Sequence, residues 1–281
     1  YINRINVHTN YIKIINIENN KKLIKEVISK VEELFGKNRA VTIRDINSPI
    51  EEEIILQKVT SAYLSSSCKF NIKKLVNLKT VEIYNKEFLN DLPKSVQNMS
   101  IFCYPRNTII NYPPNLVKLR LINANETELN NIPESVKKIY LHGITNYNIE
   151  KLGDTIKELY IYDNYNRAIN KFPKNLEILV FPLAYEHKII NLPLFLKKIK
   201  LPNMRDNEIK NLPEGLLEIN VYSYNKILKD LPNSIEIIRF VKNYHNEINK
   251  LPESLKLIEC PNEVILNPNV RISEDCKIKI I

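Results

Sequence analysis

Short runs of alternating apolar and polar residues recur along most of this chain, at intervals of about 20 residues. Each recurrence opens with an apolar residue that is followed by proline, or once by glycine: Leu92-Pro93, Tyr112-Pro113, Ile132-Pro133, Leu152-Gly153, Phe172-Pro173, Leu192-Pro193, Leu212-Pro213, Leu231-Pro232 and Leu251-Pro252. The copy that opens at Leu192 continues with Leu196, Ile199 and Leu201 and reaches the next opening through Ile209. A strict period of this length predicts a solenoid, in which each repeat buries its apolar side only against its neighbours.

The Ile-x-Leu part of each repeat alternates with a period of two, which is typical of a β-strand with one buried face. Because one strand recurs per repeat after a long return connection, we expect neighbouring strands to pair in parallel. The return path is too short for a regular helix with two turns, and it carries proline, which favours extended backbone. The pattern therefore predicts an α/β chain whose solenoid has a parallel sheet on one side and an extended, helix-poor other side.

The full unit reads Leu-Pro-x-x-Leu-x-x-Ile-x-Leu followed by Asn-x-Ile, and it resembles the leucine-rich repeat over residues 72–281. Its Leu-Pro-x-x-Leu opening is similar to two short subclasses. One is the FNIP-type repeat of social amoebae and amoeba-infecting giant viruses, which Tyr165-Asn166 and Tyr224-Asn225 echo. The other is the repeat of bacterial type III effectors. The resemblance implies a protein-interaction module that binds its partner on the concave sheet face.

Residues 1–70 lack the repeat, and their pattern predicts an α/β cap over the open end of the solenoid or a small independent domain. Strands are expected at Tyr11–Ile17 and Ala40–Ile46. A helix is expected after Asn20, and a second is expected to start at Ser48-Pro49 and continue to Tyr63, leading directly into a first repeat strand near Val81. The repeats then occupy 71–261, and short apolar runs over 262–281 predict a second cap.

Composition limits the class of partner and the cellular location that we expect. The formal net charge is +9, which fits either nucleic-acid binding or a chain that is simply rich in lysine. No apolar run is long enough to cross a membrane, and no signal peptide is recognisable. Cys68, Cys103, Cys260 and Cys276 show no zinc or redox spacing, which favours a reducing compartment. We therefore expect an intracellular or cytoplasmic location, in a host cell or in a virion.

Side chains that flank each inward pair should form the concave face, and this face is rich in tyrosine, lysine and arginine, which are frequent at binding hot spots. The predicted partner-binding residues are Lys118, Arg120, Lys138, Tyr140, His142, Tyr160, Tyr162, Lys198, Lys200 and Tyr222. Tyr140, His142, Tyr160 and Tyr162 form the best single cluster. Two explanations of these tyrosines stay open, because tyrosine also suits a half-exposed strand for structural reasons alone.

Catalysis finds little support. The four histidines are scattered without metal-ligand spacing, and four glycines are too few for a phosphate-binding loop. We therefore expect no cofactor, no metal and no enzymatic activity. Three other functions stay open: a structural part of a viral particle, the substrate-recognition part of a ubiquitin ligase, or binding of single-stranded RNA by stacked tyrosines and lysines. Glu158 and Glu218 interrupt the basic column and weigh against RNA.

Overall fold

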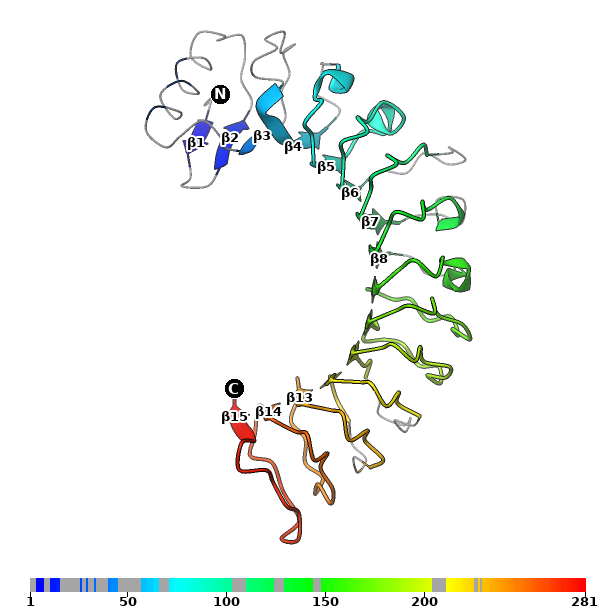
Figure 1. Cartoon of the computed structure of the whole chain (residues 1–281), viewed down its shortest axis with the longest axis vertical. Helices are drawn as coiled ribbons and strands as arrows, with labels where there is room; N and C mark the ends of the chain where they lie inside the picture. Colours follow the sequence, from blue (N-terminus) through cyan, green and yellow to red (C-terminus); the bar gives the residue numbers. More distant parts are fainter. Residues whose placement is uncertain are drawn as a thin grey trace. The chain divides into compact units, whose positions relative to one another are not determined.

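The structure is a computed structural model, and it forms two compact units, Tyr1–Ile122 and Asn123–Ile281 (Figure 1). The residues that it describes are 4–7, 11–15, 26, 29, 33, 40–44, 57–65, 71–102, 110–123, 129–143, 148–203, 211–224, 227 and 229–281. The two units are hereafter the first unit, Tyr1–Ile122, and the second unit, Asn123–Ile281. None of the described helices is long and apolar enough to cross a membrane.

The described strands of the first unit follow one another in the sheet in chain order. They are β1 (Arg4–Val7), β2 (Tyr11–Ile15), β3 (Ala40–Arg44), β4 (Val59–Leu64), β5 (Thr80–Ile83), β6 (Asn98–Ile101) and β7 (Lys118–Ile122). β1 is antiparallel to β2, and the strands from β2 to β7 are parallel. Single 3-10 turns lie at Ile72–Lys74 (η1) and Lys86–Phe88 (η2). The strands expected near Tyr11, Ala40 and Val81 are therefore confirmed.

One prediction for the first unit is wrong in its extent. Gln57 and Lys58 are helical, but the helix expected from Ser48 to Tyr63 ends there and gives way to β4, which begins at Val59 and pairs in parallel with β5. Val59, Ala62 and Leu64 are buried there, so an apolar spacing that fits a helical face also fits a bulged strand. Residues 48–56 lie outside the described part, as does most of the helix expected after Asn20. The division of the chain into cap, repeats and second cap stays a prediction.

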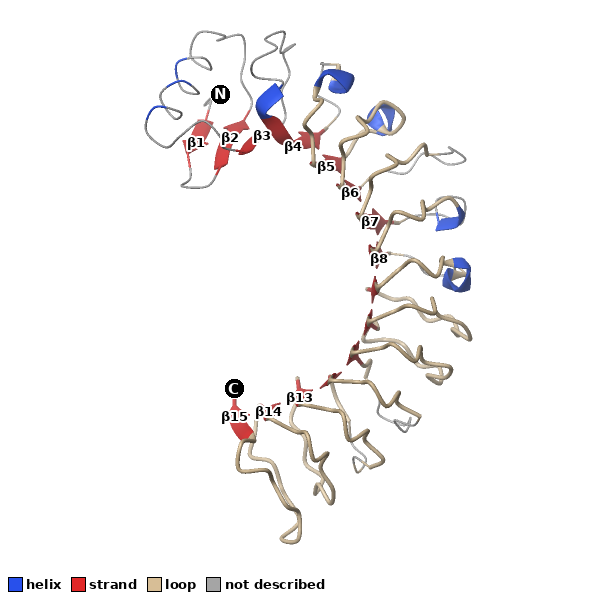
Figure 2. Ribbon diagram, in the orientation of Figure 1, coloured by secondary structure: helices blue, strands red, loops and turns tan. Residues whose placement is uncertain are grey.

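The second unit repeats one motif. Its described strands are β8 (Lys138–His142), β9 (Glu158–Ile161), β10 (Ile178–Val180), β11 (Lys198–Lys200), β12 (Glu218–Val221), β13 (Ile237–Phe240), β14 (Leu257–Cys260) and β15 (Lys277–Ile280), with a 3-10 turn η3 at Ile149–Lys151. All neighbouring pairs are parallel and in register. The strands line the inner side of this unit, and its return paths are almost entirely loops (Figure 2). The chain is therefore a parallel-strand solenoid of the leucine-rich repeat type, as the sequence predicts.

The Leu-Pro-x-x-Leu opening is a tight turn. In each described copy the carbonyl of the proline, or of Gly153, accepts a hydrogen bond of 3.0 to 3.2 Å from the amide three residues later. That geometry is a β-turn, which proline tolerates at its first position because the proline contributes only its carbonyl. The turn leaves its two central residues at the surface and sends the following apolar residue, such as Leu196, into the interior at 0% exposure.

Inward strand residues form the core between the sheet and the loops. Ile139 and Leu141 are 0% exposed, and the equivalent pairs from β5 to β14 are at most 2% exposed. Further buried tyrosine rings, which the sequence analysis did not anticipate, follow the strands: Tyr165, Tyr185, Tyr224 and Tyr244. Burial raises the pKa of Tyr165 to about 12. These large rings fill the space that a helix would occupy in a thicker repeat.

The final segment continues the repeat. β15 pairs in parallel with β14 and places Ile278 and Ile280 on the inward side, where they remain 42% and 57% exposed. Ile272 and Cys276 take the positions that Leu251 and Leu255 hold one repeat earlier, since the amide of Cys276 donates to the carbonyl of Ser273 as that of Leu255 does to Pro252. Residues 262–281 thus add a further coil to the stack.

One inward substitution on β8 and one outward substitution on β11 test this register. Ile139→Asp places an unpaired charge in the core, so the free energy of unfolding should fall by more than about 4 kcal/mol. Lys200→Glu changes a half-exposed outward residue and should alter it by less than about 0.5 kcal/mol. Denaturant unfolding followed by circular dichroism measures both. Equal effects of the two substitutions would show that the inward and outward positions are misassigned.

Candidate functional site

All ten residues predicted to contact a partner are partly buried and lie at outward positions of the strands or directly after them. Lys118 and Arg120 belong to β7 in the first unit. The others lie in the second unit, where Tyr162 and Tyr222 follow β9 and β12 by one residue. The structure brings five of them together on β8 and β9, and it separates Lys198, Lys200 and Tyr222 from these five by the intervening strand β10.

Four rings form an ordered cluster, hereafter the ring cluster, which consists of Tyr140, His142, Tyr160 and Tyr162. The rings of Tyr140 and Tyr160 stack at a centroid distance of 4.5 Å and an interplanar angle of 14°. His142 and Tyr162 stack in the same way at 4.4 Å and 13°. The parallel register sets this arrangement, since it places Tyr140 directly beside Tyr160. Each of these rings therefore has one face covered by the ring it stacks on.

Lys138 ties the ring cluster to a carboxylate. Its ammonium lies 2.5 Å from Oε2 of Glu158 and 5.0 Å from the centroid of the Tyr160 ring. Although partial burial opposes it, hydrogen bonds with Glu158 and Tyr140 raise the pKa of Lys138. The hydroxyl of Tyr160 donates to Glu158 at 2.9 Å, and burial together with this carboxylate raises the pKa of Tyr160 to about 12. The contacts hold Lys138 charged and Tyr160 neutral at physiological pH.

Beside the ring cluster the surface changes character at β10. This strand presents Ile178 and Val180 where its neighbours present charged or aromatic side chains, and Val180 is only 8% exposed. Lys200 stands next to Val180 on β11. Among the described residues, no carboxylate forms an ion pair with Lys200. The apolar side chains of Ile178 and Val180, hereafter the apolar strip of β10, therefore lie between the ring cluster and the ammonium group of Lys200.

Charged residues on the remaining strands alternate in sign. Lys198 pairs with Glu218 at 2.8 Å, and Arg239 bridges Glu218 and Glu259. Although burial opposes it, hydrogen bonds from Lys198 and Asn220 lower the pKa of Glu218. Sequence reasoning identified these charges singly but missed their pairing, which follows from the in-register stacking. Much of the positive charge on this face is consequently neutralised within the chain.

Strand exits next to the ring cluster use left-handed backbone. Asn123, Gly143 and Asp163 occupy equivalent positions with φ of 58°, 64° and 60°. A Cβ on Gly143 would meet Oδ1 of Asn123 at 1.9 Å, so glycine leaves room there for the side chain of Asn123. The carboxylate of Asp163 accepts a hydrogen bond of 2.7 Å from the amide of Gly143 and lies 3.6 Å from Nδ1 of His142. This turn orients the histidine at one edge of the ring cluster.

The site offers binding groups rather than a reactive centre. In the part of the chain that the structure describes, no group of three or more histidine, cysteine or acidic residues could hold a metal ion. Cys260 is buried and Cys276 is partly buried, and burial raises the pKa of the Cys276 thiol. A solenoid of this type is typically a non-enzymatic scaffold. The ring cluster and Lys200 supply contact area, hydroxyl groups and charge.

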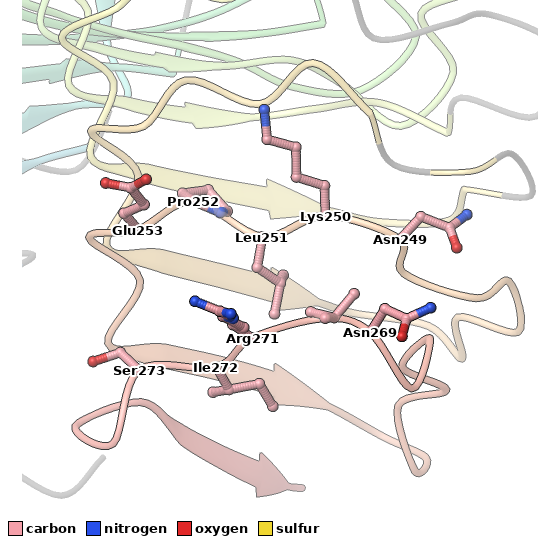
Figure 3. A pocket seen from close by; sticks show the side chains of 10 residues that line it. Asn249, Lys250, Leu251, Pro252, Glu253, Asn269, Arg271, Ile272 and Ser273 are labelled. Atoms are coloured by element: carbon pink, nitrogen blue, oxygen red, sulfur yellow. The ribbon is translucent and has the colours of Figure 1, made fainter.

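Two open depressions lie away from the ring cluster. One, of about 410 Å³, lies between the last two coils, where Leu251 points toward the coil that carries Arg271 and Ile272 (Figure 3). The other, of about 360 Å³, is lined by Lys137, Thr155, Lys157, Asn175, Glu177, Phe195 and Lys197. No residue of the predicted partner-binding set lines either depression.

Comparison with known proteins gave few matches. No family model matches this sequence, and neither does any curated protein. Among solved structures, YopM from Yersinia enterocolitica WA-314 aligns with a TM-score of 0.41 and 15% sequence identity. The alignment covers 86% of this chain and 63% of the YopM chain.

Titration of Tyr160 tests the geometry of the ring cluster. Its pKa of about 12 exceeds the ordinary value of 10.0, so ionisation should destabilise the fold as the pH rises between these values. Glu158→Gln removes the neighbouring negative charge and should lower the pKa of Tyr160, while burial keeps it above 10.0. Nuclear magnetic resonance of the labelled tyrosine ring carbons, assigned with Tyr160→Phe, measures the change.

Glu177→Gln is the matched control, because Glu177 pairs with Lys157 and Lys197 outside the ring cluster. It should leave the pKa of Tyr160 unchanged. The same shift in both variants would mean that Glu158 does not contact the Tyr160 hydroxyl.

Proposed function

We propose that this protein is a non-enzymatic interaction module that binds a protein partner on the outward face of β8 to β11. The observation that carries the proposal is the adjacency of the ring cluster, the apolar strip of β10 and Lys200. Fixed aromatic side chains lose little conformational entropy when a partner covers them, so a preformed cluster favours binding. A central apolar patch with a polar rim is also the usual composition of a protein interface.

The ring geometry favours protein over single-stranded RNA. Base stacking needs an open aromatic face, and the stack at 4.5 Å covers one face of Tyr140 and one face of Tyr160. The lysines that would contact phosphates are also committed, since Lys138 pairs with Glu158 and Lys198 with Glu218. A protein surface can instead contact ring edges and hydroxyl groups. We therefore infer a partner that places an aliphatic side chain on Val180 and a carboxylate near Lys200.

The finer resemblance supports a setting for this function. We propose that the chain is an FNIP-like short-repeat protein that works inside an amoeba or in a giant virus, because its repeat step and the Tyr-Asn pairs at Tyr165 and Tyr224 are similar to that subclass. A recognition part of a ubiquitin ligase would use the same face. A particle component would use it for lasting contacts with other particle proteins.

Partner capture tests this assignment. Tyr162→Thr removes one stacked ring at a strand exit while keeping a residue that suits extended backbone. Immobilised wild-type and variant chains are incubated with nuclease-treated amoeba lysate, and the bound proteins are identified by mass spectrometry. We expect a partner of the wild type whose affinity for the variant falls at least about tenfold in a binding titration.

Tyr84→Thr provides a control of matched chemistry. Tyr84 follows β5 by one residue and stacks on Phe102 at 4.4 Å, as Tyr162 stacks on His142. The Tyr84→Thr variant should bind the partner as the wild type does. Equal capture by the Tyr162→Thr variant and by the wild type would show that the binding site lies outside the ring cluster. Capture from untreated lysate that is absent from the nuclease-treated lysate would favour the RNA alternative.

A further inference from the structure

One turn departs from the pattern of the turns that open the Leu-Pro repeats. The two central residues of these turns are elsewhere polar, proline or glycine, as in Asp154-Thr155, Lys174-Asn175 and Glu214-Gly215, although the turn before β5 also carries an apolar residue, Val76. In the repeat that opens at Leu192 they are Leu194 and Phe195, with 82% and 63% of their surface exposed. No other described large apolar residue is as exposed as these two.

The exception removes a stabilising bond that several repeats make. At the position of Phe195, the side chains of Asn115, Asn175, Ser234 and Ser254 each donate to a backbone carbonyl of the preceding repeat. Asn175 donates to the carbonyl of Asp154 at 2.9 Å, and Ser234 donates to that of Leu216 at 2.7 Å. A phenyl ring cannot donate such a bond, and this ring gains little burial in exchange. Folding alone therefore does not account for Phe195.

The next turn leaves the ring uncovered. Gly215 occupies the position equivalent to Phe195 one repeat later, and a Cβ there would lie 3.7 Å from the carbonyl oxygen of Leu194, an ordinary contact distance. Packing would thus accept a side chain that partly covers Phe195. Leu217, 40% exposed, follows in the same repeat. These residues form an apolar patch, hereafter the Leu-Phe patch, which consists of Leu194, Phe195 and Leu217.

Basic residues lie beside the Leu-Phe patch. Phe195 lines the depression of about 360 Å³ together with Lys137, Lys157 and Lys197. The carboxylate of Glu177 lies 2.7 Å from Lys157 and 2.8 Å from Lys197, and these two hydrogen bonds lower the pKa of Glu177 to about 2. Three lysines against one glutamate leave the depression positive. The side chains of Lys157 and Lys197 also remain more than half exposed.

We propose that the Leu-Phe patch is a second docking surface, which binds an acidic, amphipathic segment of another protein. An aliphatic or aromatic side chain of that segment covers Leu194 and Phe195, and a carboxylate enters the depression and pairs with Lys157 or Lys197. The apolar exposure and the positive charge support this occupant together.

The test uses random linear peptides displayed on phage and selected against the full 281-residue chain. Enriched peptides should combine carboxylates with aliphatic or aromatic residues. Their affinity is then measured by fluorescence anisotropy for the wild type and for the double variant Leu194→Lys, Phe195→Asn. Loss of both apolar contacts should weaken binding at least about 30-fold.

The same double variant should fold at least as well as the wild type. It restores a polar turn like Lys174-Asn175, so its Tm should be unchanged or higher by up to about 3 °C. A second variant, Lys157→Gln with Lys197→Gln, should weaken binding about tenfold and reduce its dependence on salt. Tyr162→Thr should leave peptide affinity unchanged, which separates this surface from the ring cluster.

Three results would overturn the proposal. Enriched peptides could lack carboxylates, or the double variant could bind the enriched peptides as tightly as the wild type does. The third result is binding of the wild type to phosphatidylserine vesicles that the double variant loses, without enrichment of any peptide.

Discussion

The rest of this structure depends on stacking the inward apolar pair of each strand on the pair of the next strand. A single repeat is too thin to bury Ile139 and Leu141 alone, so its stability comes from its two neighbours. The stacking is effective only in register, because a slip of one residue would turn every inward side chain outward. Burial of this pair therefore fixes the position of every outward side chain in the second unit.

Register turns a periodic sequence into rows of equivalent side chains about 4.8 Å apart. At that spacing, like charges repel and aromatic rings stack. The charges therefore alternate in sign along these rows. Lys198 is followed by Glu218 on the sheet face, and Lys157 is followed by Glu177 and Lys197 on its edge. Where rings meet, as at Tyr140 and Tyr160, they lie nearly parallel. The exceptional positions in such rows, Val180 and Phe195, are those that the stacking does not explain.

Periodicity made most of the repeat region predictable. The Leu-Pro openings and the Ile-x-Leu segments specify turns, strands and inward residues, because the same local solution recurs in each repeat. The β4 strand was missed because its bulge makes the spacing of Val59, Ala62 and Tyr63 resemble a helical face. The buried tyrosines and the ion pairs were also missed. They depend on which residues become neighbours across repeats, which a single repeat does not reveal.

The outward face could be assigned from the sequence, but its internal pairing could not. Tyr140 and Lys138 were both identified, yet the role of Glu158 in holding Lys138 against the rings depends on distances. The Leu-Phe patch was not identified from the sequence, although Leu194 and Phe195 are the apolar exception among the Leu-Pro turns. Its binding potential depends on the exposure of Phe195 and on the lysines around it.

Because each repeat stacks on its neighbours, the distance between two positions on the sheet of the second unit is set by the number of strands between them. The turn that carries Phe195 leads into β11, two strands beyond Tyr160 on β9. The intervening repeat, which carries Glu177 and Val180, contributes to both surfaces. Loss of this repeat would shorten the stack by one strand spacing, about 4.8 Å, and would change both surfaces in one step.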